Sequence, residues 1–138
     1  MKIKLDSGAF LPVRAHATDA GIDLRSPRAA KLWLFRRWAV IDTGVHVEIP
    51  KGYVGLLLAK SGLNTKRHIT REGVIDAGYT GSIVVKLYKR AGLRSYRIAK
   101  GDKISQLVIL PVLRPAPVQV DKIEGGERGD NGFGSTGR

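Results

Sequence analysis

Short runs in which apolar and polar residues alternate recur along the chain and predict β-strands. Residues 45–49 alternate Val, His, Val, Glu and Ile, a period of two that is typical of a strand with one buried face. Residues 83–88 alternate in a similar way. Residues 53–59 and 105–112 are more continuously apolar, which favours strands buried on both faces. The pattern therefore predicts an all-β protein.

Turn signals separate these runs, at residues 6–8, 50–52, 91–92 and 100–102. Short strands at this spacing favour a sandwich, a jelly roll or a barrel. The chain contains no internal repeat and no linker, so we expect residues 1–138 to form a single domain. Only a C-terminal lid, residues 124–138, is expected to be loosely held.

Residues 31–38, with the sequence KLWLFRRW, depart from this pattern. They contain both tryptophans and lack the Pro or Gly expected at a hairpin turn, and because their apolar residues do not alternate cleanly, a short helix is an alternative. Three interpretations stay open: a hairpin that is buried or packed in a trimer, a patch for a partner or a membrane surface, and a stacking site for nucleic acid.

Composition narrows the class of protein. The 138 residues include no cysteine, which excludes disulfides and thiolate metal sites and suits a cytoplasmic location. No apolar run is long enough to span a membrane, and the N-terminus lacks a signal-peptide pattern. The net charge of +12 attracts polyanions, but scattered lysines and arginines also simply solvate a surface. A nucleic-acid partner is therefore not expected from charge alone, and a small triphosphate would benefit from the same field.

Two glycine-rich blocks carry candidate chemistry. Residues 128–138, RGDNGFGSTGR, are either a disordered tail or a lid in which Phe133 stacks on a base and Arg128 binds phosphate. Residues 73–81, GVIDAGYTG, place one carboxylate, Asp76, and one aromatic ring, Tyr79, in a tight turn. Asp76 is either a general base that activates water or a residue that caps the turn.

Three further blocks complete an ordered set: AGIDL at residues 20–24, KSGL at 60–63 and GDKISQL at 101–107. From about residue 10 to the C-terminus, the five blocks resemble the homotrimeric dUTPases, the deoxyuridine triphosphate nucleotidohydrolases. The resemblance implies a distorted jelly roll of the β-clip type. It also implies a homotrimer that hydrolyses dUTP between its α and β phosphates, giving dUMP and pyrophosphate.

The resemblance also implies roles for the hairpin. Asp76 matches the general base of the family, and Tyr79 matches the ring that packs against deoxyribose and excludes a 2′-hydroxyl. Backbone groups of Gly73, Val74 and Ile75, and those near Val84, would contact the edge of uracil.

Other blocks match the phosphate and metal sites. Ser61 and Gly62 resemble a phosphate cradle; Lys60 replaces the arginine common in the family, so the charge is kept and the bidentate geometry is lost. Gln106 matches a phosphate-contacting glutamine. Asp23 matches the aspartate that holds Mg²⁺ through water, the ion itself being ligated by the phosphates; the alternative is a turn aspartate beside Gly21.

In the family each site is built from three subunits. One subunit contributes the Ser61 and Gln106 blocks, a second contributes the Asp76–Tyr79 hairpin, and a third contributes the lid. The lid residues that match here are Arg128, Phe133, Gly134 and Ser135. The three histidines, at positions 16, 46 and 68, show no ligand spacing and are expected on the surface or in loops, without metal.

Two alternatives stay open, a second enzyme and a binding protein. A dCTP deaminase of the same fold usually has Asp-Pro-Gly before a Trp or Phe and a catalytic glutamate, whereas residues 76–79 are DAGY. Fold alone says little about chemistry. The second alternative is a regulatory binding protein with the dUTPase fold, whose partner site would lie in residues 33–38.

Overall fold

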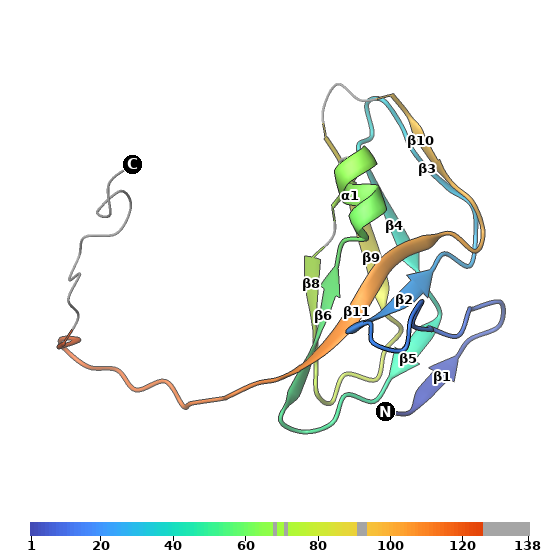
Figure 1. The fold of residues 1–138 in the computed structure, drawn as a ribbon. Coiled ribbons are helices and arrows are strands. Elements are labelled where there is room, and N and C mark those ends of the chain that lie inside the picture. Colours follow the sequence, from blue (N-terminus) through green and yellow to red (C-terminus); the bar gives the residue numbers. More distant parts are fainter. Residues whose placement is uncertain (68, 71, 91–93, 126–138) are drawn as a thin grey trace.

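The computed structural model describes residues 1–67, 69–70, 72–90 and 94–125 (Figure 1). Within these ranges the chain forms four antiparallel sheets and a single short helix, α1, Ser61–Arg67. The predicted all-β class is therefore confirmed. No helix in the described ranges has the length and apolar character needed to cross a membrane.

The largest sheet has four strands in the order β2-β11-β6-β8. Its strands are β2, Gly21–Arg25; β11, Lys103–Pro111; β6, Tyr53–Leu58; and β8, Glu72–Asp76. A bulge between Lys103 and Ser105 shifts the register of β11 against β2. The sheet joins segments that are distant in the sequence, and it therefore brings three of the five glycine-containing blocks into one sheet, on β2, β11 and β8.

A three-stranded sheet faces it, in the order β4-β9-β7. Its strands are β4, Trp38–Asp42; β9, Val84–Lys89; and β7, Ile69–Thr70. Two smaller sheets pair β1, Ile3–Leu5, with β5, Val45–Val47, and β10, Tyr96–Ile98, with β3, Ala30–Leu32.

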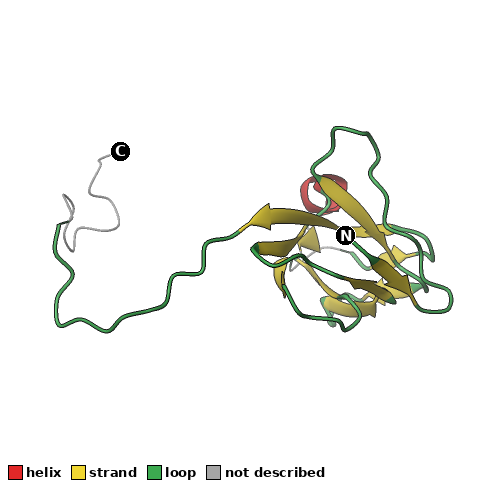
Figure 2. Ribbon diagram, turned by 90° about the horizontal axis from the view of Figure 1, so that it is seen from below, coloured by secondary structure: helices red, strands yellow, loops and turns green. Residues whose placement is uncertain are grey.

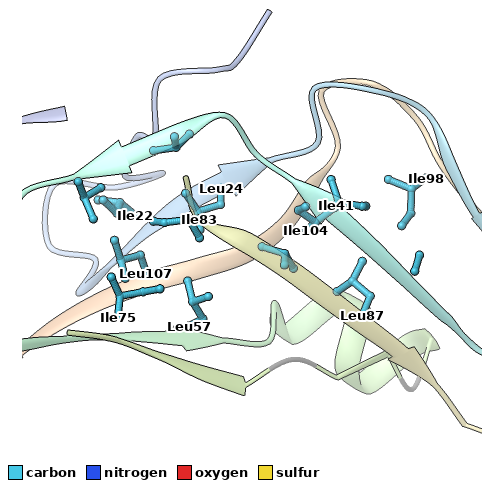
Figure 3. Packing of buried hydrophobic residues seen from close by; sticks show 14 of the residues in the cluster. Ile22, Leu24, Ile41, Leu57, Ile75, Ile83, Leu87, Ile98, Ile104 and Leu107 are labelled. Carbon is cyan, nitrogen blue, oxygen red and sulfur yellow. The ribbon is translucent and has the colours of Figure 1, made fainter. Parts of the chain in front are cut away.

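The core lies between the two larger sheets (Figure 3). Fully or nearly fully buried aliphatic side chains come from both layers, among them Leu24, Ile41, Leu57, Leu87 and Leu107. Gly55 on β6 permits this close packing, because a Cβ there would lie 2.9 Å from Leu107 Cδ1 and 3.2 Å from Ile75 Cβ.

The predicted alternation is confirmed at residues 45–49, where the apolar residues are buried and the intervening ones are not. It is also confirmed in β9, where Val85 and Leu87 are buried while Val84 and Tyr88 are exposed. Three of the predicted turns have a glycine with positive φ, at Gly8, Gly52 and Gly101. The fourth, at residues 91–92, lies outside the described residues.

Two expectations need correction. Residues 53–59 and 105–112 are not buried on both faces, since Tyr53, Leu58 and Leu110 are exposed in this chain. Helix α1 was not predicted. It begins where the Lys60 carbonyl accepts a hydrogen bond from Asn64 N at 2.9 Å, and the Thr65 hydroxyl donates to the Ser61 carbonyl at 2.7 Å.

Residues 31–38 form the end of β3, a loop and the start of β4, so the short helix is wrong. Trp33 N donates to the Arg36 carbonyl at 2.9 Å, which closes the loop without Pro or Gly. Phe35 is 93% exposed, and Trp33 is also exposed with the Lys31 ammonium 3.7 Å from its ring centre. The side chains at the tip are therefore not buried within this chain; packing in a trimer and partner binding stay predictions.

After β11 the chain leaves the body as an extended arm, well before residue 124 (Figures 1 and 2). Residues 112–125 contain no strand or helix. Leu113 and Ile123 on the arm are almost fully exposed. The predicted lid residues Arg128, Phe133, Gly134 and Ser135 lie outside the described residues.

Candidate active site

The turn that follows β8 forms a pocket with the start of β9. The chain reverses at Gly78, with φ of +98°, and Tyr79 N donates to the Asp76 carbonyl at 3.1 Å. The pocket has a volume of about 240 Å³ and is lined by the predicted substrate residues Val74, Ile75, Asp76, Tyr79 and Val84, together with Ser82. Gly73 belongs to the same strand but is not among the lining residues.

The Asp76 carboxylate is exposed at the end of β8. The turn is closed by the backbone carbonyl of Asp76 and not by its side chain. Among the described residues, no group forms a hydrogen bond or ion pair with this carboxylate. It is thus held at a strand end and free to accept a proton from water, which is what a general base requires.

Tyr79 folds back over its own turn. Its hydroxyl donates to the Ser82 carbonyl at 3.0 Å, and its ring lies so close to Gly81 that a Cβ there would collide with it. Ser82 in turn donates a short hydrogen bond to Asp42 on β4. The bond to the Ser82 carbonyl thus positions the ring as one wall of the pocket.

A second cluster lies where β2, β6 and β11 meet. Asp23 on β2 is 3% exposed, and its two oxygens contact Lys60 Nζ at 2.6 Å and Lys103 Nζ at 2.7 Å. Burial alone would raise the pKa of Asp23, but the hydrogen bonds and charges of Lys103 and Lys60 outweigh it and hold the pKa below its ordinary value. The carboxylate therefore stays ionised and fixes two ammonium groups side by side.

Gln106 lies beside this cluster. It pairs with Asp23 across the β2–β11 ladder, and its amide donates to the Ala59 carbonyl at 3.2 Å. Gly21 makes room for it, since a Cβ there would lie 2.8 Å from Gln106 Oε1. Ser61 follows Lys60 directly and begins α1, where the first backbone N–H groups have no intrahelical partner.

The cluster thus brings together Asp23, Lys60, Ser61 and Gln106, all predicted site residues, with Gly62 next in the chain. Lys103 was missed by sequence reasoning. The available signal was its position in the GDKISQL block, three residues before Gln106.

The described residues do not form a protein-built magnesium site. They contain no group of three His, Cys, Asp or Glu side chains that could hold an ion. Both oxygens of Asp23 face lysines, which repel a cation. The chemistry of this cluster fits an anion better than a metal.

The two clusters lie at opposite ends of the four-stranded sheet. Asp76 pairs with Val54 on β6, whereas Gln106 pairs with Leu58. At about 3.3 Å per strand residue, the four residues from Val54 to Leu58 separate these two pairings by about 13 Å, and Lys60 lies beyond the end of β6. One chain therefore does not bring all the predicted site residues together.

Three comparisons identify relatives of the chain. A deoxyuridine 5′-triphosphate nucleotidohydrolase from Tropheryma whipplei (strain Twist) is 41% identical over 137 residues, covering 97% of this chain and 93% of its own length. The structure of the Staphylococcus bacteriophage 80alpha dUTPase with dUpNHpp has a TM-score of 0.88 at 39% identity and covers 99% of this chain and 98% of that one.

A mutant dUTPase from phage phi11 of S. aureus, described with a structural Mg(II) ion, has a TM-score of 0.81 at 35% identity and covers 90% of this chain and 98% of that one. The sequence profile of the dUTPase family matches residues 8–137. The chain therefore belongs to the dUTPase family.

Proposed function

We propose that this protein hydrolyses dUTP to dUMP and pyrophosphate, and that Asp76 activates the attacking water. The observation that carries this proposal is the Asp76 carboxylate in the wall of a pocket that also contains Tyr79, where no described residue bonds to it. A carboxylate with no protein partner can bind and orient a water, and a rigid strand end keeps it in position.

Discrimination among nucleotides follows from the same pocket. Tyr79 is held by its bond to the Ser82 carbonyl, so it cannot easily move aside for a 2′-hydroxyl. Val74, Ile75 and Val84 contribute apolar side chains to the lining of the pocket. Backbone groups of β8 are available to bind the uracil edge, and a buried polar group left unpaired by the wrong base is a strong penalty.

Phosphate binding is assigned to the other cluster. Lys60 and Lys103 supply two positive charges that Asp23 holds in place, and Ser61 and Gln106 supply neutral donors. The site residues Gly62, Arg128, Phe133, Gly134 and Ser135 complete the proposed set, the last four as a lid.

A homotrimer would unite the two clusters. The separation of about 13 Å along β6 between the strand pairings of the two clusters favours a site built from different subunits. The arm supports the same idea, because exposed apolar side chains such as Leu113 and Ile123 are normally covered by another surface.

Magnesium would enter with the triphosphate as its ligand, and it would neutralise phosphate charge. Within the described chain, Asp23 is the predicted residue nearest to this role, acting through water. Because its oxygens already contact lysines, we assign no step of hydrolysis to the ion.

Pyrophosphate release from dUTP, dCTP, dTTP and UTP, measured with magnesium and with EDTA, tests the activity. We expect dUTP to be strongly preferred and Asp76→Asn, which keeps the shape but removes the base, to lower kcat by about 10²–10⁴. Equal turnover of dUTP and UTP would contradict the role of Tyr79, and full activity of Asp76→Asn would contradict the mechanism.

Subunit mixing tests the shared site. Asp76→Asn and Gln106→Ala trimers should each be poorly active, because each lacks one part of every site. If the two residues come from different subunits, refolding a 1:1 mixture should restore about one quarter of the sites by random assembly. No recovery would show that both residues act within one chain.

A further inference from the structure

His46 links the N-terminal region to the turn that carries Tyr79. It lies on β5, and its side chain is 18% exposed. Its Nδ1 is 2.8 Å from the Thr80 carbonyl oxygen, and its Nε2 is 3.0 Å from Asp6 Oδ2. These two partners are 34 and 40 residues away in the sequence, so only the fold brings them together.

The two partners define the charge state of the ring. A carbonyl oxygen and an ionised carboxylate both accept hydrogen bonds and neither donates. A neutral imidazole has one N–H and can satisfy one of them, whereas the imidazolium ion has two and satisfies both. The geometry therefore favours the cation.

Thr80 belongs to the turn of the proposed substrate pocket. It follows Tyr79 directly, and the next residues return to β5, where Ile83 N donates to the Val45 carbonyl at 2.8 Å. Asp42 binds Ser82 on the other side of the turn. His46 is thus one of the contacts that hold the turn against the body.

Charged groups surround His46 on several elements. Asp6 is paired with Lys4 at 3.5 Å, Lys2 is paired with Glu48 at 3.1 Å, and Asp42 lies on β4. The turn itself, residues 77–83, contains no charged side chain. The Lys4 ammonium, which acts on the ring as a like charge, is itself paired with Asp6.

The pKa of His46 is raised by its bond to Thr80 and then by its bond to Asp6, which together outweigh burial and the charge of Lys4. The bond from His46 correspondingly lowers the pKa of Asp6. Because the pKa of His46 is raised, the stabilisation from having both bonds is complete below the ordinary value of about 6.5. It is lost as pH rises through the raised value, when the ring keeps a single N–H for its two acceptors.

We propose that His46, as the cation anchored on Asp6, is a positioning residue that fixes the Thr80 carbonyl and with it the Tyr79 wall, so that affinity for dUTP falls when His46 loses its proton. This inference rests on the proposed function of the pocket. His46 touches neither the predicted base nor the phosphate cluster, so its effect should appear in KM and leave kcat nearly unchanged.

The test compares His46→Ala with the wild-type protein across pH. Ionisation of dUTP affects the KM of both proteins equally at each pH, so the ratio of the two KM values removes this effect. We expect a ratio of about 3 to 10 at low pH, the effect of one hydrogen bond of ordinary net strength, and a smaller ratio at high pH, where the neutral ring has one N–H for its two acceptors. Asp6→Asn should shift this pH dependence to lower pH, because it removes the negative partner.

His16→Ala is the matched control, since His16 is exposed and its ring makes no hydrogen bond among the described residues. It should leave the KM profile unchanged. A His46→Ala ratio that does not vary with pH, or an Asp6→Asn profile that does not shift, would overturn the proposal.

Two further measurements separate this proposal from the proposed function. In NMR titrations of the wild-type protein, the amide resonance of Gly81, which follows the Thr80 carbonyl, should shift with pH together with the resonances of the His46 ring. The same amide should not shift in this pH range in His46→Ala. An amide that does not respond in the wild-type protein overturns the positioning role.

Calorimetry with dUpNHpp measures affinity without turnover. Absence of hydrolysis with pH-dependent binding would contradict the proposed function and support the role of His46.

Discussion

The buried carboxylate of Asp23 offers a sharp test of the phosphate cluster. Asp23→Asn keeps the shape of the side chain and removes its charge, leaving Lys60 and Lys103 close together without a counterion. Removing one partner of a buried ion pair typically costs about 3–5 kcal/mol of unfolding free energy. Here the lysine side chains are 25% and 34% exposed and can turn towards water, so we expect a loss of about 2–4 kcal/mol.

The assay is denaturant unfolding at one fixed protein concentration, because the stability of the proposed trimer would depend on concentration. Glu48→Gln is the matched control. It removes a carboxylate from an exposed pair with Lys2, at 3.1 Å, and should cost less than about 1 kcal/mol.

The pH dependence has a defined sign. Because the folded pKa of Asp23 is lowered, its stabilisation is present above the unfolded value of about 3.9 and is lost as pH falls through the folded value. The difference between wild type and Asp23→Asn should therefore shrink in acid.

An Asp23→Asn protein within about 0.5 kcal/mol of wild type at neutral pH would refute the buried-pair argument. Loss of activity that excess magnesium restores, with stability unchanged, would instead favour the water-mediated metal role predicted for Asp23.

The remaining predictions concern assembly, the lid and Gln106. Light scattering should give about three times the chain mass, and a fully active monomer would contradict the shared site. A chain ending at Gly126 should remain folded but lose most turnover, as measured by pyrophosphate release; a full rate would mean that the tail is dispensable. Gly21→Ala should displace the Gln106 side chain and raise KM for dUTP several-fold, with a smaller effect if Gln106 is also changed to Ala.

Much of the fold could be predicted because local patterns carry it. A period of two assigns alternate side chains to opposite faces of a strand, and residues 45–49 and 83–88 follow it. The GVIDAGYTG block predicted a tight turn, since Gly78 can adopt positive φ and Asp76 and Tyr79 bracket it. The assigned site roles rest on such blocks and stay predictions.

Exposure was harder to predict than strand position. An apolar run such as residues 53–59 indicates a strand but does not say whether a second layer covers it, and here part of one face is open within the chain. The same holds for residues 33–38, whose composition suits a core although Phe35 lies in solvent.

By itself, the sequence determined the β class, several turns and the ordered blocks that define the family, because each depends on residues close together in the chain. Only the tertiary structure decided which charges meet. The pairing of Asp23 with Lys60 and Lys103 depends on the register of β2, β6 and β11, and the bridge of His46 between Asp6 and Thr80 depends on the packing of β5 against the turn. Electrostatic contacts act through space over a few ångströms, so they follow strand pairing and not sequence spacing.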